Sequence, residues 1–255
     1  MTIGLVTLSN EGAVLADRVR RVFPNSDMYV HENVEGKWDA ERFGSIVELT
    51  GRIFDKHGGL VYVAPCGVVV RALAPNLKNK IQDPAVVVVD VGARWAISLL
   101  SGHEGGANEL AVAVGNILAA EPVISTTTEA LKRVIVGVGC RRGVKSEKIV
   151  AAIQAALKEA DLNLPQVRLI SSASIKADEE GLLAAARELG VPLRFMTAEE
   201  IRMSVREFDH SPFVEEKVNL PAVAEPCALL AGRRTRLVLP KRSYDGITIA
   251  LAEES

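Results

Sequence analysis

Continuous apolar runs of strand length constrain the fold of this 255-residue chain more than any other feature. The segment "LVYVAP" (60–65) shows no alternation of polar and apolar residues, and "AVVVVD" (85–90) begins with five apolar residues in a row. A strand that is apolar on both faces is typical of a parallel sheet covered by helices on each side. Segments with helical periodicity separate these runs, so the sequence predicts an α/β fold.

The order of predicted strands and helices indicates two α/β domains, each with a mainly parallel sheet flanked by helices. We place the boundary after residue 131, which gives an N-terminal domain at 1–131 and a C-terminal domain at 132–255. The predicted strands are 2–9, 60–65, 85–90, 95–100, 122–126, 134–139, 166–171, 192–196, 236–241 and 246–252. The predicted helices are 11–23, 38–59, 102–120, 146–160, 179–189 and 223–232, with short helices after a capping-box pair at Thr197 and Glu200 and after an N-cap at Ser211.

Composition and charge argue against several classes of protein. The 30 basic side chains against 32 acidic ones give a net charge of −2, whereas nucleic-acid-binding proteins usually carry a basic excess. No apolar run approaches the roughly eighteen residues that span a bilayer, and no basic region precedes the apolar N-terminal stretch, so we expect a soluble cytoplasmic protein without a membrane partner. The scattered Cys66, Cys140 and Cys227 support neither a disulfide framework nor a zinc site and are expected to be small buried thiols. A small-molecule ligand is therefore the default expectation.

The segment "SGHEGGAN" (101–108) is the first candidate functional site. Its S-x-x-E spacing predicts that Ser101 is the N-cap of a helix and Glu104 its capping-box partner, which leaves His103 in the first turn. A helix N-terminus disfavours an imidazolium ion, so His103 would stay neutral and could act as a base. Glycine in a helix costs about 1 kcal/mol relative to alanine, which suggests that Gly105 and Gly106 admit a ligand or another backbone. The alternative is that the glycines allow tight packing and the histidine only caps the helix.

A second candidate site lies in "GVGCRRGVKS" (137–146), which follows a predicted strand and precedes a predicted helix. Backbone N–H groups at such a junction bind anions, and Arg141, Arg142 and Lys145 would make the loop cationic. The G-x-G-x-x-x-G spacing is one residue longer than the dinucleotide fingerprint, so we do not expect a nicotinamide cofactor. A solvated basic loop is the alternative.

Other chemically active side chains have weaker support. Glu225 stands at a predicted helix start before a proline, where it is either a functional carboxylate or a surface glutamate favoured by the helix dipole. Cys66 is a possible nucleophile, although a structural thiol is expected, and Arg71 is a possible anion clamp. Lys80 and Asp83 precede a predicted strand and would face solvent.

Several of these segments together resemble the cobalamin biosynthesis protein G family, the cobalt-precorrin-5A hydrolases of the anaerobic vitamin B12 pathway. The family's N-terminal region is similar to "VAPCGVVVRALAPNLKNKIQDPAVVVVDVGARWAISLLSGHEGGANELA" and "PVISTTTEA". Its C-terminal domain, also found as a free-standing protein of the aerobic pathway, is similar to "VGVGCRRGVKSEKIVAAI", "SSASIKADEEGL", "PLRFMTAEEI" and "VAEPCALLAG". The chain departs from the family pattern in lacking a middle region after "STTTEALKR", in "ISTTTEA" where a threonine-rich segment usually ends in aspartate, and in Asn219 and Pro221 before "VAEP".

The resemblance implies a hydrolase that opens the δ-lactone of cobalt-precorrin-5A and releases acetaldehyde to give cobalt-precorrin-5B. It also implies partners among the corrinoid intermediates and other enzymes of that pathway. No metal site or diffusible cofactor is expected, because the cobalt belongs to the substrate. His103 is then the candidate general base and Glu225 the second candidate acid or base. Substrate binding is assigned to Arg71, Lys80, Ser101, Gly102, Gly105, Gly106, Asn108, Gly139, Arg141, Arg142 and Lys176.

Two other functions are compatible with the same segments. A non-catalytic carrier of corrinoid intermediates would use "SGHEGGAN" and "GVGCRRG" to bind carboxylates without chemistry. A nucleotide-binding Rossmann enzyme rests on fold analogy alone and is weakened by the failed fingerprint.

Overall fold

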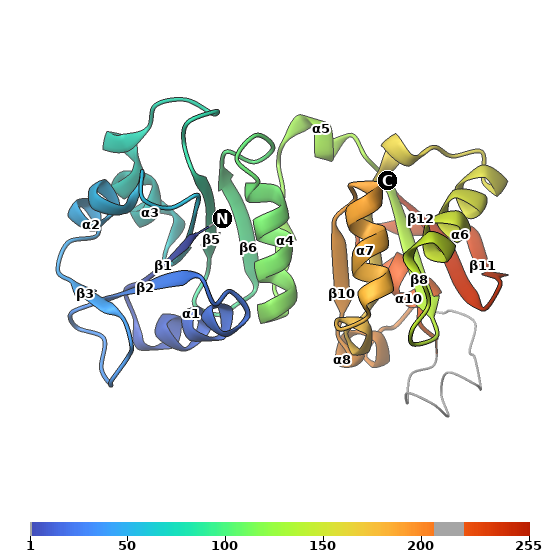
Figure 1. The fold of residues 1–255 in the computed structure, drawn as a ribbon, viewed down its shortest axis with the longest axis horizontal. Helices are drawn as coiled ribbons and strands as arrows, with labels where there is room; N and C mark the ends of the chain where they lie inside the picture. The colour runs from blue at the N-terminus through green and yellow to red at the C-terminus, as the bar shows by residue number, and fades with distance from the viewer. Residues whose placement is uncertain (1, 207–221) are drawn as a thin grey trace. The chain divides into compact units, whose positions relative to one another are not determined.

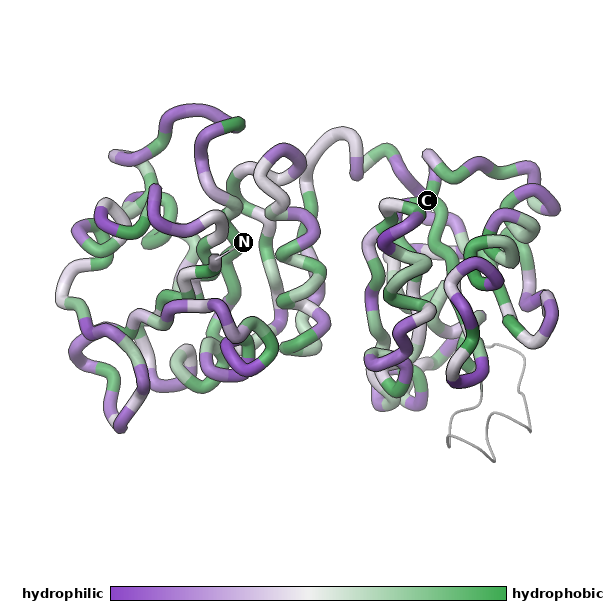
Figure 2. Tube along the Cα trace, viewed as in Figure 1, coloured by the Kyte–Doolittle hydropathy of each residue, from purple (hydrophilic) through white to green (hydrophobic). Residues whose placement is uncertain are grey.

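The computed structural model describes residues 2–206 and 222–255 (Figure 1). The chain divides into two compact units, residues 1–126 and 127–255. In each unit the strands are largely hydrophobic, whereas the loops carry many of the hydrophilic residues (Figure 2). No helix in the described part of the chain is long and apolar enough to cross a membrane.

The first unit is built on a seven-stranded sheet with the order β3-β2-β1-β4-β5-β6-β7. Its strands are β1 (Ile3–Thr7), β2 (Ser26–His31), β3 (Glu41–Phe43), β4 (Gly59–Val63), β5 (Ala85–Val89), β6 (Trp95–Leu100) and β7 (Glu121–Val123). Neighbouring strands are parallel except for β5 and β6, which are antiparallel. Every residue of β1, β4 and β5 is buried, which explains the continuous apolar runs and confirms the α/β prediction.

Helices cover both faces of this sheet. They are α1 (Asn10–Val22), α2 (Ile46–Ile53), α3 (Cys66–Leu73) and α4 (Ala107–Leu118), with the 3₁₀ turn η1 (Ala74–Asn76) after α3. Helices α1 and α4 share one apolar cluster with the sheet, in which Leu110 and Val87 take part. Helices α2 and α3 belong to a second cluster, which contains Val69 and Val86. Because Val86 and Val87 are successive strand residues, the two clusters occupy opposite faces of the sheet.

The prediction of a single helix over 38–59 is wrong in its first half. Residues Glu41–Phe43 form the edge strand β3 instead. Helix α2 begins at Ile46, after the N-cap Ser45, whose Oγ accepts a hydrogen bond from the N–H of Glu48. The helical pattern therefore holds only for the second half of the segment.

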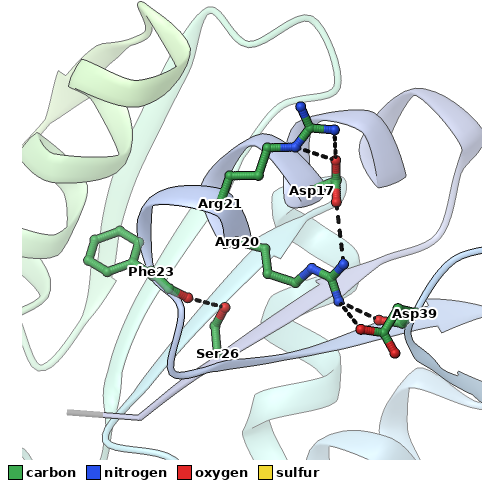
Figure 3. A network of polar contacts seen from close by, with 6 residues as sticks. All are labelled: Asp17, Arg20, Arg21, Phe23, Ser26 and Asp39. Carbon is green, nitrogen blue, oxygen red and sulfur yellow. Dashed lines mark hydrogen bonds and ion pairs between the residues drawn. The ribbon is translucent and has the colours of Figure 1, made fainter.

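Arginine side chains explain why the first half is not helical. The guanidinium of Arg42 donates to three backbone carbonyls of the preceding loop, those of Glu32, Val34 and Gly36. Arg20 of α1 holds the same loop by donating to the carboxylate and the backbone carbonyl of Asp39, as Figure 3 shows. These contacts join residues without regular spacing, so tertiary structure overrides the local pattern.

The second unit contains a five-stranded sheet with the order β10-β9-β8-β12-β11. Its strands are β8 (Val134–Cys140), β9 (Val167–Ala173), β10 (Leu193–Met196), β11 (Thr235–Tyr244) and β12 (Ile247–Glu254). Strands β8, β9 and β10 are parallel, whereas β12 is antiparallel to both β8 and β11. The sheet is therefore only partly parallel. Asp245 and Gly246 join β11 to β12 with positive φ angles of 50° and 81°, as a primed hairpin turn requires.

Helices also cover both faces of the second sheet. They are α6 (Ser146–Glu159), α7 (Glu180–Leu189), α8 (Ala198–Arg202) and α10 (Ala224–Leu230), with 3₁₀ turns η2 (Leu164–Gln166) and η3 (Ser174–Lys176). The short helix α5 (Thr127–Ala130) precedes β8 and has no buried residue. Ile153 of α6 and Leu182 of α7 share a cluster with Val136, whereas Cys227 of α10 shares one with Ile135. Helix α10 therefore lies on the face opposite α6 and α7.

The predicted capping box of α8 is confirmed. The N–H of Glu200 donates to Thr197 Oγ1 at 3.1 Å, and the N–H of Thr197 donates to Glu200 Oε2 at 2.7 Å. The N-cap predicted at Ser211 lies outside the described residues, as do Asn219 and Pro221.

Helix α10 lies directly against β8 at Gly137. A Cβ at this position would overlap the carbonyl oxygen of Ala224 and lie 2.8 Å from the backbone nitrogen of Ala228. We expect Gly137→Ala to lower the free energy of unfolding of the second unit by about 2–4 kcal/mol, because the backbone of α10 must move. Chemical denaturation followed by circular dichroism would measure the change.

Gly139→Ala is the matched control, two residues along the same face of β8. The nearest atom to its added Cβ would lie 3.6 Å away, an ordinary contact. Its unfolding free energy should stay within about 1 kcal/mol of wild type. Equal losses for the two variants would show that the packing of α10 does not require a glycine at 137.

A buried histidine lies at the amino edge of the first sheet. His57 is 5% exposed, and its Nε2 lies 2.9 Å from the hydroxyl of Tyr29. Lys56 donates to the same hydroxyl and to the carboxylate of Asp27. Burial lowers the pKa of His57, the nearby Asp27 carboxylate raises it, and the Lys56 ammonium lowers it further, with a net lowering. The folded protein therefore favours the neutral imidazole.

This histidine makes stability depend on pH. The folded pKa of His57 lies below the unfolded value of about 6.5. The contribution of His57 to the unfolding free energy is therefore complete above the unfolded pKa and is lost as the pH falls from there through the folded pKa. We expect the unfolding free energy to decline between about pH 7 and 5.5, and His57→Gln to reduce that slope. His31→Gln, which leaves His57 in place, should retain it. A wild-type slope in His57→Gln would contradict this assignment.

Candidate functional site

The first candidate site is the turn between β6 and α4, which we call the glycine turn and define as residues 101–106. Strand β6 is antiparallel to β5, and Leu100 pairs with Val86 near the start of β5. The glycine turn therefore lies at the amino edge of the parallel strands. A Cβ on Gly105 would lie 2.5 Å from the Ser101 Cβ and 3.4 Å from the backbone nitrogen of Ala85, so only glycine fits there without a shift.

The predicted capping box of α4 is wrong. The helix begins at Ala107, and its N-cap is Gly106 with a φ of 85°, not Ser101. Glu104 consequently has no capping partner, and His103 is exposed in the turn before the helix rather than in its first turn. The S-x-x-E pattern fails here because Ser101 adopts a φ of 55° and closes the turn with its own carbonyl.

Backbone hydrogen bonds fix the shape of the glycine turn. The carbonyl of Ser101 accepts the N–H groups of Gly105 and Ala107, at 3.1 and 3.2 Å. Within the described chain, the N–H groups of Gly102, His103 and Gly106 donate no hydrogen bond. The buried Oγ of Ser101 is also without a hydrogen-bond partner among the described residues. The turn thus offers free donors beside an exposed imidazole, which suits an anionic or developing oxyanionic group.

Hydrogen bonds of Asn108 fix the glycine turn to neighbouring segments. Its side chain is buried, its Oδ1 accepts a hydrogen bond from Ser98 Oγ at 2.8 Å, and its Nδ2 donates to Thr126 Oγ1 at 3.0 Å. Its backbone N–H donates to the carbonyl of Gly102 at 2.9 Å. Asn108 is part of the sequence motif, but nothing in the sequence indicates that Ser98 and Thr126 form hydrogen bonds with its side chain.

Of the two cations predicted in this unit, one contacts the glycine turn. Lys80 Nζ lies 2.6 Å from Glu104 Oε1, so the lysine is not simply a solvated side chain. Arg71 is exposed on α3, and its Nη1 donates to the carbonyl of Gly67 one turn earlier. In the described first unit, no hydrogen bond or ion pair joins Arg71 to the glycine turn.

The second candidate site lies at the carboxyl edge of β8 and β9, where the loop 140–145 meets the loop 174–179. The basic loop is less cationic than the sequence suggests. Arg142 pairs with Asp178 at 2.9 Å, and the N–H of Gly143 donates to Glu179 Oε1 at 2.8 Å. Sequence reasoning did not single out these two acidic residues, although both stand in "SSASIKADEEGL".

Burial separates the predicted cations of this second site. The Lys176 side chain is 12% exposed and lies 3.7 Å from Glu179, which is 5% exposed. Arg141 and Lys145 are exposed, and no ion pair holds either of them in the described part of the second unit. Arg141 is therefore the better placed cation for an external anion.

Glu225 is not a surface glutamate. It is 3% exposed in the first turn of α10, and its Oε1 accepts a hydrogen bond from the backbone N–H of Lys241 at 2.9 Å.

A Cβ on Gly139 would make only ordinary contacts with Val223 and Thr248, so no close backbone approach requires that glycine.

The three cysteines differ in burial. Cys227 is buried and Cys140 half-buried, and burial raises the pKa of both thiols. Cys66 is exposed at the start of α3, so the expectation of a buried thiol is wrong for this residue. Among the described residues, no three His, Cys, Asp or Glu side chains are grouped to hold a metal ion.

Comparison with known families finds one match for most of each unit. Residues 48–129 match the family described as Cobalamin synthesis G N-terminal, and residues 134–252 match Cobalamin synthesis G C-terminus. The chain belongs to the cobalamin synthesis G (CbiG) family. The two matches leave only residues 130–133 between them.

Two relatives of this CbiG chain are named for an enzymatic activity. A cobalt-precorrin-5A hydrolase of Priestia megaterium is 24% identical, with 97% of this chain and 94% of the relative covered. The enzyme of the same name from Salmonella typhimurium is 25% identical, with 98% and 97% covered. Protein CobE of Sinorhizobium sp is 33% identical over 49% of this chain and 83% of its own. The first alignment spans 351 positions, so that relative has residues without a counterpart here.

The buried amide of Asn108 makes the glycine turn sensitive to substitution. Asn108→Ala should lower the unfolding free energy of the first unit by about 1–3 kcal/mol, because two partly buried hydrogen bonds are lost and the Ser98 and Thr126 hydroxyls lose this partner. Urea denaturation would measure the loss. Asn33→Ala, at an exposed asparagine, is the control and should change stability by less than about 0.5 kcal/mol. Unchanged stability of Asn108→Ala would contradict the role given to this amide.

Proposed function

We propose that this member of the CbiG family hydrolyses the δ-lactone of cobalt-precorrin-5A and releases acetaldehyde to give cobalt-precorrin-5B. Two full-length relatives are named cobalt-precorrin-5A hydrolases, which supports the substrate. The observation that carries the proposal is the glycine turn, with its free backbone N–H groups beside the exposed His103. Cobalt enters as part of the substrate, and we propose no resident metal or cofactor.

The proposed chemistry begins with water. His103 accepts a proton from a water molecule as that water attacks the lactone carbonyl, and the N–H groups of Gly102 and Gly106 stabilise the oxyanion. The acyl C–O bond then breaks, which leaves a carboxylate and a hydroxyl group. Loss of the hydroxyl proton and cleavage of the adjacent C–C bond release acetaldehyde, while the conjugated macrocycle takes up the electron pair. In the second unit, Glu225 is a separate candidate acid or base.

The substrate is a flat macrocycle edged with carboxylates, so cations should set its orientation. In the first unit, Lys80 beside the glycine turn is the main candidate, with Arg71 on α3 as a more distant one. In the second unit, Arg141 is the exposed cation without an ion pair among described residues, whereas Arg142 and Lys176 would first have to leave Asp178 and Glu179.

Substitution of His103 tests the proposal directly. His103→Gln should lower kcat by about 10²–10⁴-fold, because the general base is lost while the exposed position tolerates the change. Anaerobic incubation with cobalt-precorrin-5A, with acetaldehyde release and macrocycle mass measured together, gives the rate. His31→Gln is the matched histidine control and should retain wild-type turnover.

Three other results would change the assignment. Wild-type activity in His103→Gln would remove this residue as the base. A large loss in Glu225→Gln at unchanged stability would assign the proton transfer to the second unit. Tight binding of substrate and product by the wild-type protein without acetaldehyde release would favour the non-catalytic carrier.

A further inference from the structure

We propose that a carboxylate of the substrate opens the Lys80–Glu104 ion pair, and that the released Glu104 carboxylate accepts the second proton of the reaction. This inference rests on the proposed function and adds a catalytic residue to the glycine turn. Sequence reasoning treats Glu104 only as a capping residue, a role that the structure removes. The following observations concern the first unit alone.

Glu104 is placed to act on a ligand rather than on the helix. Its side chain is partly exposed, and its partner is the ammonium group of Lys80 at 2.6 Å. It follows His103 directly in the glycine turn, in which the N–H groups of Gly102, His103 and Gly106 donate no hydrogen bond among the described residues. Lys80 and the backbone N–H of Glu104 itself hold the pKa of this carboxyl below its ordinary value. Glu104 is therefore ionised at neutral pH and can accept a proton.

Lys80 is presented by a loop that its own hydrogen bonds keep in shape. Asn79 Oδ1 accepts the N–H groups of Ile81 and Gln82, each at 3.1 Å. Asp83 is buried, so the expectation that it faces solvent is wrong, and its carboxylate accepts the N–H of Lys78 at 2.9 Å. Ile81, at the tip, is 78% exposed. The loop thus presents a cation and an apolar side chain in sequence, which matches a macrocycle with an apolar face and a carboxylate edge.

The ion pair is of the kind that a ligand can displace. The side chains of Lys80 and Glu104 are 73% and 36% exposed, and exposed pairs contribute little to stability. A substrate carboxylate can therefore take the place of Glu104 on Lys80. Once the lysine is occupied, the cation no longer lowers the pKa of Glu104, and the carboxylate becomes a stronger base.

The released carboxylate serves the second half of the reaction. After the lactone opens, Glu104 takes the proton of the new hydroxyl group. The electrons of that O–H bond form the C=O bond of acetaldehyde, and the C–C bond to the macrocycle breaks. The conjugated macrocycle accepts that electron pair, and Glu104 returns its proton to water. The step needs no oxidant or reductant.

Two substitutions test the two parts of this inference. Glu104→Gln should lower kcat by about 10²-fold and remove the acidic limb of the kcat–pH profile. The same variant should bind cobalt-precorrin-5A about two- to fivefold more tightly, because Lys80 loses its internal competitor. Lys80→Met should raise both the KM and the dissociation constant about tenfold or more, with kcat little changed. Absorbance titration gives binding and acetaldehyde release gives turnover.

The chain offers matched controls for both variants. Glu109→Gln changes another exposed carboxylate, in the first turn of α4. Lys78→Met breaks the Lys78–Asp55 pair, an exposed ion pair of 2.7 Å from the same loop. Both controls should keep turnover and binding within about twofold of wild type, and urea denaturation should show that all four variants are folded.

Failure of this inference is distinguishable from failure of the proposed function. Wild-type turnover in Glu104→Gln overturns the catalytic role, and weaker binding by that variant overturns the competition for Lys80. A wild-type protein that binds the macrocycle but releases no acetaldehyde refutes both the hydrolase function and the proton transfer to Glu104. In that case the tighter binding expected of Glu104→Gln and the weaker binding expected of Lys80→Met still test the exchange of carboxylates at Lys80. A wild-type protein that does neither overturns both proposals.

Discussion

The antiparallel pairing of β6 with β5 is the constraint on which the first candidate site depends. If β6 were parallel, like the other neighbours in its sheet, its carboxyl end would lie with the ends of β4 and β5. The reversed strand instead brings residues 101–106 to the edge where β5 begins, beside the loop that carries Lys80. Topology therefore joins two segments that are separated in sequence by two strands, and the contact between Lys80 and Glu104 follows from it.

The sequence predicts those parts of the structure that burial alone decides. Strands β4 and β5 are recognisable because every residue is apolar, and the capping box at Thr197 is recognisable because its hydrogen bonds are local. The same reasoning fails for β3, where the guanidinium of Arg42 binds carbonyls of a loop. It also fails at Ser101, where the S-x-x-E pattern is present but close contact with Gly105 favours a tight turn.

The candidate site is less predictable than the fold because charges choose their partners through tertiary structure. His103 and the glycines are visible in the motif, but nothing local indicates that Glu104 pairs with a lysine 24 positions away. Likewise, Arg142 pairs with Asp178 across 36 positions. A basic sequence segment therefore predicts that cations are present, but only the folded structure shows which of them are already held in ion pairs.

Burial then decides which of these cations can exchange partners. Lys176 and Glu179 are both nearly enclosed, and removing either partner from such a pair leaves an uncompensated charge in a low-dielectric setting. Lys80 and Glu104 face water, which stabilises each charge after the pair opens. A ligand carboxylate can thus compete for Lys80 at low cost, whereas Lys176 is retained by its own protein. The difference in burial therefore favours the exposed pair over the buried one for the ligand exchange that we propose.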